Sequence, residues 1–423
     1  MRYIAVLMAL TFGWSQGAWA FCGFYVASAG PTPFNDASKV VLARQGQRTT
    51  ITMSSDVSGA PKDFALVIPV PTVVERNQVR VVQSATVDHL DQYSVPRLVE
   101  YHDEDPCAPP PPPMMMLAVP APTAAMPRTR GDTALGVRVE AEYSVGEYDI
   151  QVLSAQDSSG LVTYLNARRY RIPDGAGPVI GSYLRQGMHF FVAKVNLGRV
   201  NTGGTTFLRP IQVEYSSPKF MLPIRLGTVN ARGPQDMVVL ALTERGRVET
   251  TNYPVRRMPT GTAIPVYVKD GFNDFYRAVF DRQVQDADGQ ATFLEYAWDM
   301  GACDPCSAPP LANDELRELG ASWVQASPYL NQPTFLTRLH VRYDRAHFPE
   351  DLALQETSDR ESYQARYVVT HAWTGEAACE AGKRYTASLP NRYRQAARNV
   401  VELTNWSYAD VKRRMDETGE RVP

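Results

Sequence analysis

The alternation of apolar and polar residues predicts paired strands over much of the chain. Residues 39–44 and 48–53 alternate on either side of Gly46, a pattern typical of a β-hairpin. Residues 64–70 form an almost unbroken apolar run that ends in prolines, which predicts a buried strand stopped by proline. Further strands are expected at 137–143, 148–153, 189–195, 337–343 and 365–370.

Apolar residues at helical spacing predict an amphipathic helix over 272–285. The C-terminal end is expected to form two helices, 389–403 and 407–415, which pack across the second half of the chain. Ser407 and Asp410 have the spacing of a capping box at the start of the second of these helices. Shorter helices are expected at 86–93, 158–169 and 313–319.

Proline dominates one internal stretch. Residues 109–127 contain five consecutive prolines followed by three consecutive methionines. Because proline lacks a backbone N–H, this stretch is expected to join neither a helix nor a sheet. It is therefore predicted to be an extended and mobile connection.

Several short segments recur in the same order, most of them at offsets near 198 residues. Recurrence in the same order indicates a divergent internal duplication. A real internal repeat would determine the architecture of the protein. Chance recurrence among common strand sequences is the alternative. The matches include Val40–Ala43 with Val238–Ala241, Ile68–Val70 with Ile264–Val266, and Asp105–Cys107 with Asp304–Cys306.

The patterns together predict an α+β protein. We expect two related units of mixed, mainly antiparallel sheet with short helices, followed by a helical C-terminal tail. The expected divisions are a signal peptide at 1–20, a first unit at 21–204 with a Pro-rich loop at 108–130, a second unit at 205–380, and C-terminal helices at 381–423.

The N-terminal residues have the features of a secretory signal peptide. One arginine precedes an apolar run over 4–14, and Ala18-Trp19-Ala20 predicts cleavage between Ala20 and Phe21. No later stretch reaches the roughly 20 apolar residues that a membrane helix requires. These features predict a periplasmic or secreted protein with no integral membrane span after signal removal.

Composition narrows the possible partners. Hydrophobic residues make up 44% of the chain, which is sufficient for packed cores, and the formal net charge is -2. A charge so close to zero gives no electrostatic reason to expect nucleic acid or an anionic membrane as a partner. An unknown protein or small ligand is the expected partner.

Five cysteines are the disulfide candidates, and in an oxidising compartment they are expected to pair with one left over. Cys22–Cys107 is the expected long-range bridge, and the remaining three are expected to hold one bridge and one free thiol. The Cys-x-x-Cys spacing also fits a thiol redox pair, although no helix begins directly after it. A zinc site would need a second pair of ligands. The candidates are Cys22, Cys107, Cys303, Cys306 and Cys379.

Other residue patterns point to no chemistry. The six histidines are scattered, and no metalloprotease, nucleophile-elbow or phosphate-binding motif occurs. The acidic clusters 103–105 and 350–351 are interpreted as solvated loop carboxylates, with weak calcium binding as the alternative. No catalytic residue, metal ligand or cofactor is therefore assigned.

Two segments are informative together: the opening Phe21-Cys22-Gly23-Phe24-Tyr25-Val26 and the run 64–71. With them the chain resembles the bacterial exported proteins of the domain of unknown function 2330 family. Further matching motifs are Gly146–Asp149, Cys303–Cys306 and Arg342–Asp344. The resemblance extends over nearly the whole chain after residue 20. It implies export and a shared fold, and it transfers no activity or site residue.

Two classes of function remain open. The first is a non-enzymatic binding or structural protein outside the cytoplasm, with a ligand in the groove between related halves, near the two Asp-Pro-Cys turns. The second is a thiol–disulfide-active or hydrolytic enzyme whose site is assembled from distant residues. The absence of a nucleophile, metal or cofactor motif favours the first class.

Overall fold

The structure is a computed structural model that describes most of the chain. It covers residues 24–27, 34–58, 64–108, 138–168, 170, 172–199, 208–229, 231, 233–302, 308–325 and 333–422. The predicted signal peptide, the Pro-rich stretch 109–127 and three cysteines (Cys22, Cys303 and Cys306) lie outside these ranges. Among the helices within them, none is both long and apolar enough to cross a bilayer.

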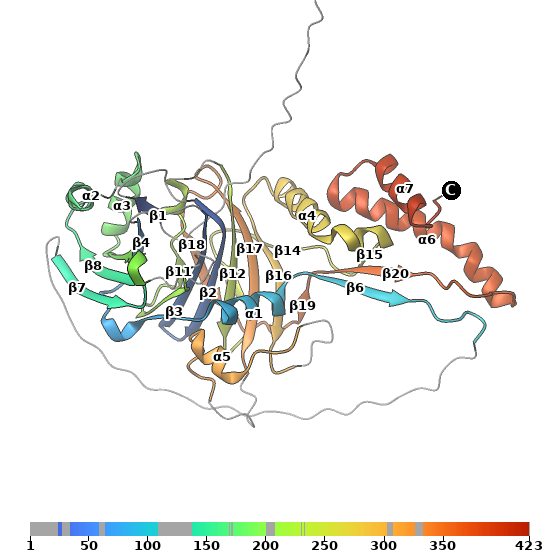
Figure 1. Ribbon diagram of the computed structural model, residues 1–423, viewed down its shortest axis with the longest axis horizontal. Helices are drawn as coiled ribbons and strands as arrows, with labels where there is room; N and C mark the ends of the chain where they lie inside the picture. The colour runs from blue at the N-terminus through green and yellow to red at the C-terminus, as the bar shows by residue number, and fades with distance from the viewer. Residues whose placement is uncertain are drawn as a thin grey trace, which may run out of the picture.

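A twisted sheet of nine described strands forms the centre of the molecule (Figure 1). Its neighbouring strands are mostly antiparallel, and β19 (Tyr363–Gln364) pairs with β16 beside the main path. The order along the sheet is β14 (Val255–Arg257), β16 (Thr292–Asp299), β17 (Phe335–Tyr343), β12 (Gln235–Thr243), β2 (Phe34–Gln45), β3 (Arg48–Ser58), β10 (Ile211–Ser216) and β5 (Val79–Val81).

The two strands at the middle of this sheet carry the repeated Val-Val-Leu-Ala sequence. β2 and β12 run parallel, and Val40 lies opposite Val239. Both faces are covered, so alternate side chains such as Val41 and Leu42 enter cores on opposite sides of the sheet. This explains why both segments are continuously apolar rather than alternating.

The strand pairing bears on the predicted duplication. The register in which β2 pairs with β12 differs by one residue from the alignment of the repeated sequence. Leu42 and its match Leu240 therefore face opposite sides of the sheet. The hairpin partner of β2 is β3, whereas the segment after β12 leads to β13 (Val248–Thr250), which pairs with another strand. The duplication therefore remains a prediction, and the two proposed units share one sheet.

A second sheet packs on one face of the central sheet and encloses the largest core. On its outer face lie α2 (Ser158–Ala167) and α3 (Ala176–Leu184), over a core that includes Phe190 and Tyr183 (Figure 1). The order in the second sheet is β1 (Phe24–Ala27), β4 (Phe64–Val70), β9 (His189–Val195), β8 (Tyr148–Ser154) and β7 (Arg138–Val145).

Smaller elements close the remaining sides. The opposite face of the central sheet is covered by α1 (Ser84–Ser94) and α5 (Asn313–Glu318). Short 3-10 helices lie at Arg76–Gln78, Leu197–Arg199, Gly227–Val229 and Val266–Gly271. A small sheet has the order β11 (Met221–Leu222), β18 (Leu352–Glu356) and β13.

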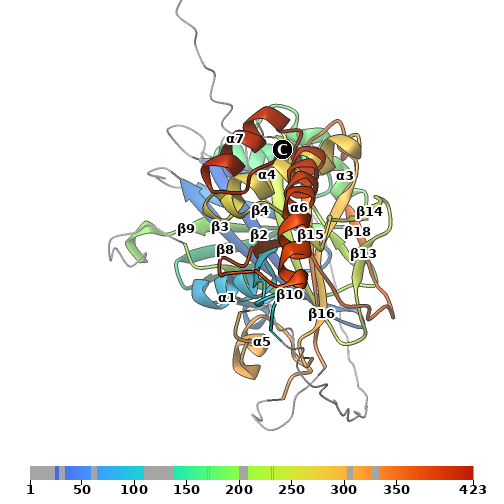
Figure 2. The same ribbon diagram turned by 90° about the vertical axis from the view of Figure 1, so that its right-hand side faces the viewer.

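An arm extends from the central sheet and contains the C-terminal helices (Figures 1 and 2). Its three strands are all mutually parallel, and Tyr367 and Val369 pack under the helices. On the other face Tyr101 and Arg366 are exposed, although parallel sheets are usually covered on both faces. The arm consists of β15 (Thr262–Ile264), β20 (Arg366–His371), β6 (Arg97–His102), α4 (Phe272–Asp286), α6 (Glu380–Thr404) and α7 (Tyr408–Glu417).

A disulfide joins the loop after β6 to the start of α6. Cys107 is bonded to Cys379, and their Cα atoms are 6.0 Å apart. The predicted Cys22–Cys107 bridge is therefore wrong, as is the pairing of Cys379 within a trio with Cys303 and Cys306. The pairing follows from the parallel alignment of β6 with β20, which brings segments about 270 residues apart to the same end of the arm.

The α+β class with several mainly antiparallel sheets and a helical C-terminal tail is confirmed. The first tail helix begins at Glu380, nine residues earlier than predicted, and contains Pro390. The tail packs mainly against α4 and β15 of the second half, as predicted. Ser407 is the N-cap residue of α7, but its side chain makes no capping hydrogen bond.

Candidate functional site

A partly open pocket of about 210 Å³ lies at the seam between the second sheet and the central sheet. Pro69 and Pro71 form one side at the end of β4, and the segment before β9 supplies a second side. The turn between β10 and β11 supplies the rest. Its lining residues are Pro69, Pro71, Gln186, Met188, Tyr215, Ser217, Pro218, Lys219, Met221 and Pro223.

The prolines occur where strand pairing ends. Pro69 lies opposite Phe190 of β9, whereas β1, on the other side of β4, pairs only as far as Val67. Pro69, which lacks an N–H, therefore removes no hydrogen bond between β4 and β1. Because prolines form much of the wall, the pocket is rich in apolar ring surface and poor in backbone donors.

A buried arginine fixes the turn that lines the pocket. Arg44 donates from Nη2 to the carbonyl oxygen of Ser217 (3.1 Å) and from Nη1 to the hydroxyl of Thr49 (2.6 Å). Its guanidinium also lies over the ring of Phe220, 5.1 Å from the ring centre. These contacts hold the Ser217–Phe220 turn in one conformation, so this wall is formed before any ligand arrives.

Asp351 fixes the opposite side. Its Oδ1 accepts hydrogen bonds from the backbone N–H of Ile224 (2.9 Å) and Arg225 (3.1 Å) and from the hydroxyl of Tyr183 (2.6 Å). Burial and the Asp351 carboxylate raise the pKa of Tyr183 well above its usual value. The interpretation of the 350–351 cluster as solvated carboxylates is therefore wrong for Asp351, which joins α3 to the chain beside Pro223.

Lys219 is the charged residue of the pocket lining. It is exposed, and within the described part of the chain no carboxylate pairs with it. Gln186, Ser217 and Tyr215 add polar groups around the apolar walls. The arrangement suits a compact apolar group that carries a negative charge, because no carboxylate among the described residues neutralises the cation.

A buried ionic network is the second concentration of unusual side chains. Glu295 of β16 accepts from Nε of Arg338 (2.6 Å) and from the hydroxyl of Tyr276, and His340 lies 2.8 Å from its Oε1. Burial by itself would raise the pKa of Glu295. The charges of His340 and Arg338, with hydrogen bonds from His340 and Tyr276, outweigh it and lower the pKa to about 2.

This network is closed to ligands. Glu295 is 1% exposed and Arg338 6%, and Phe280 stacks on the ring of His340. Arg338 also bonds Asp91 of α1, so the network ties α1, the central sheet and α4 together. Buried ion pairs of this kind perturb pKa values for structural reasons, and this site is interpreted as structural.

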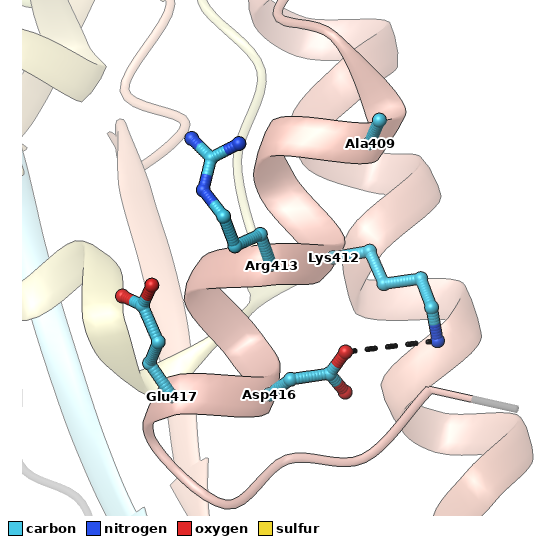
Figure 3. A pocket seen from close by; sticks show the side chains of 5 residues that line it. All are labelled: Ala409, Lys412, Arg413, Asp416 and Glu417. Atoms are coloured by element: carbon cyan, nitrogen blue, oxygen red, sulfur yellow. Dashed lines mark ion pairs between the residues drawn. The ribbon is translucent and has the colours of Figure 1, made fainter.

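Two other surface depressions are not lined by side chains that suggest a ligand or a reaction. Figure 3 shows one along α7, where Ala409, Lys412, Arg413, Asp416 and Glu417 all come from a single helix and Lys412 pairs with Asp416 at 3.8 Å. The other lies in the turn between β13 and β14, over 249–255. The first depression is an exposed helix face and the second is the surface of a turn, and we assign no site to either.

The candidate residues named from the sequence are not brought together at the pocket. Cys107 lies at the end of the arm, bonded to Cys379, while Cys22, Cys303 and Cys306 lie outside the described residues, as does the Ala20–Phe21 cleavage site. In the described ranges no three His, Cys, Asp or Glu side chains gather so as to hold a metal ion. Asp103 of the first acidic cluster instead binds Tyr385 and Arg392 of α6.

Comparison with known families gives one match. A family model described as an uncharacterized protein conserved in bacteria, DUF2330, matches residues 16–355, which is most of the chain. The chain belongs to the DUF2330 family. The match includes every residue of the pocket and ends before β20, α6 and α7. Searches of curated proteins and of solved structures give no match.

No motif in the sequence indicates the pocket, because its walls come from three separate segments. The available signal was weak. Pro69, Pro71, Pro218 and Pro223 each stand at or just beyond a strand end, and paired prolines at two strand ends mark a place where backbone donors are missing.

Proposed function

We propose that this DUF2330 protein is an exported, non-enzymatic binding protein whose pocket holds a compact apolar group bearing an anion. The observation that carries the proposal is the pocket itself. Its walls are held by Arg44 and Asp351, and its single charged lining residue, Lys219, has no partner in the described chain.

The volume limits the ligand. A cavity of about 150 Å³ lined by apolar side chains is large enough for benzene, so 210 Å³ suits one aromatic ring with a short substituent. Typical sites for drug-sized ligands have roughly 300–1,000 Å³, which this pocket does not reach. The expected ligand is therefore a small aromatic or branched acid, or a single side chain of a larger partner.

Export is supported by two features. The first 20 residues have the pattern of a cleaved leader, and the Cys107–Cys379 bond suits an oxidising compartment. No observation on the described residues favours the thiol-active or hydrolytic alternative. The histidine–carboxylate pairs His89–Glu315, His340–Glu295, His347–Asp344 and His371–Glu100 all lie away from the pocket lining.

Phenylacetate and its neutral analogue phenylacetamide are suitable probes, followed by ligand-detected NMR and protein chemical shifts. We expect phenylacetate to bind with a Kd of about 1 mM, as befits ten heavy atoms, and to bind more tightly than phenylacetamide. Lys219→Met should weaken phenylacetate about tenfold and leave phenylacetamide unchanged, because it removes the cation and retains an apolar side chain.

Lys383→Met is the matched control, since Lys383 is an exposed lysine of α6 far along the chain from the pocket. It should leave the binding of both probes unchanged. Equal loss in the two lysine variants, or no binding of either probe at 10 mM ligand, would contradict the proposal.

A further inference from the structure

β6 is an edge strand with an unpaired side. The arm sheet has the order β15, β20, β6, and β6 has no second strand partner among the described strands. An exposed edge presents unpaired N–H and C=O groups to any strand that can reach it. Helix α6 packs near β15, at the opposite edge of the sheet, and its contacts with Asp103 and Cys107 lie beyond the end of β6.

The register determines which backbone groups point outward. Arg97 N–H donates to Ala365 and Asp103 N–H donates to His371, both at 2.9 Å. In a parallel ladder alternate residues face the same neighbour, so 97, 99, 101 and 103 bond to β20. The N–H and C=O groups of Leu98, Glu100 and His102 therefore point to the free edge.

These outward residues are placed symmetrically about Glu100. In an antiparallel pair centred on Glu100, Leu98 lies opposite the partner's His102, and each outward residue exchanges backbone hydrogen bonds with its counterpart. On the open face Val99 lies opposite the partner's Tyr101, an aromatic and β-branched pair of the kind that stabilises sheets. Tyr101 is 52% exposed here, which pairing would reduce.

The charges at the two ends of β6 are also complementary to themselves. Arg97 and, beside it on β20, Arg366 lie at the start of the strand, while Asp103 and Glu104 follow its end. Antiparallel pairing places the basic start of one strand at the acidic end of the other. Glu104 is exposed and available for this.

We propose that β6 pairs with β6 of a second copy of this chain, antiparallel about Glu100, to form a six-stranded sheet across a two-fold axis. The same surface is used on both subunits, as closed dimers require. The proposal is independent of the ligand pocket, which lies in another part of the fold.

One contact opposes this pairing. Glu100 faces the partner's Glu100, and like charges directly opposite each other destabilise a sheet. The carboxylate is, however, already bonded at Oε2 by Lys269 Nζ and His371 Nε2, both at 2.9 Å. Lys269 thus has a specific role in the dimer, which is to neutralise Glu100 at the centre of the interface.

Sedimentation velocity of the purified full chain from about 5 to 500 μM tests the proposal. Pairing of one short strand buries less than a standard interface, so we expect a Kd on the order of 10–100 μM. Lys269→Met should weaken the dimer about tenfold. Glu100→Gln should retain the dimer or tighten it, because the repulsion is removed and the backbone donor remains.

Glu100→Pro removes the outward N–H at the centre of the interface as well as the Glu100 carboxylate, and it leaves the ladder to β20 intact. It should abolish the dimer, whereas Glu100→Gln lacks the charge but keeps the N–H and should not. Its thermal unfolding transition and far-UV circular dichroism show whether it has folded. A monomer at 500 μM, or a dimer equally strong in Lys269→Met and in a folded Glu100→Pro variant, would overturn the proposal. If Glu100→Pro does not fold, the weaker dimer predicted for Lys269→Met and the equal or tighter dimer predicted for Glu100→Gln decide it.

Discussion

In the central sheet β2 and β12 bury apolar side chains on both faces, whereas in the arm β6 and β20 are covered on one face only. The central strands are held by many small contacts shared among neighbours. The arm has an apolar core under its helices on one face, and the end of β6 is tied to α6 by a few specific bonds, namely the Cys107–Cys379 disulfide and the contacts of Asp103 with α6. Single substitutions in the arm, or at its junction with the central sheet, should therefore lower the stability of those regions locally.

The largest expected effect is loss of the disulfide. It closes a loop of about 270 residues, and the chain-entropy estimate for so long a loop is about 5.6 kcal/mol of stability. Replacing Cys107 and Cys379 together by serine should lower the midpoint of urea unfolding. Hydrogen exchange should accelerate in β6, β20 and α6.

The central strands β2 and β12 are the internal control for that experiment. Their exchange should remain slow in the double variant. Equal acceleration in the two regions would mean that the arm and the central sheet unfold as one unit and do not differ in local stability.

The next effect is expected at the junction. Glu295→Gln leaves the buried guanidinium of Arg338 with Asp91 as its remaining carboxylate, and breaking a buried pair typically costs about 3–5 kcal/mol. Arg257→Gln is the matched control, because its pair with Glu361 is exposed and its loss should cost far less than breaking a buried pair. A Glu295→Gln cost as small as the control would contradict the structural role of the network.

The same variant gives a pH test. The pKa of Glu295 is lowered to about 2 in the folded state, so its contribution to stability is present above the ordinary glutamate pKa near 4.5. That contribution is lost as the pH falls from about 5 towards 2. The stability difference between wild type and Glu295→Gln should therefore shrink by about 3 kcal/mol over this interval, measured by urea unfolding at each pH.

The smallest effect concerns a single hydroxyl group in the arm. The hydroxyl of Tyr385 donates to Asp103 (2.6 Å) and accepts from the backbone N–H of Trp373 (2.8 Å). Tyr385→Phe should reduce stability by about 1 kcal/mol. Tyr408→Phe, at an exposed position of α7, should change it by no more than about 0.5 kcal/mol. Indistinguishable thermal midpoints for the two variants would argue that α6 is held without Asp103.

The sequence predicted elements well where the signal was local. The hairpin around Gly46, the proline-ended strand 64–70 and the helix over 272–285 follow from periodicity and turn residues, which need no knowledge of the rest of the chain. Helix α3 was missed because Gly177, Pro178 and Gly181 interrupt its pattern. Its helical conformation is supported by packing of Ile180 and Tyr183 against the second sheet.

Long-range relations were not predictable in the same way. The partner of Cys107 depends on the alignment of β6 with β20, and the buried state of Asp351 depends on backbone donors about 126 residues away. The pocket depends on the packing of the second sheet against the central sheet and on the contacts of Arg44 and Asp351 that hold its walls. Each requires the assembled fold, and a pattern within one segment contains no information about it.

The parallel pairing of β2 with β12 also has a consequence for how the chain folds. Residues that are neighbours at the centre of the sheet are separated by almost 200 positions in the sequence. Topologies rich in such non-local contacts fold slowly, since loop-closure entropy is lost before the contacts form. Until β12 arrives, the β2–β3 hairpin has an apolar edge open to aggregation. A chaperone that binds this hairpin during synthesis or translocation would therefore raise the yield of folded protein, most strongly at high expression.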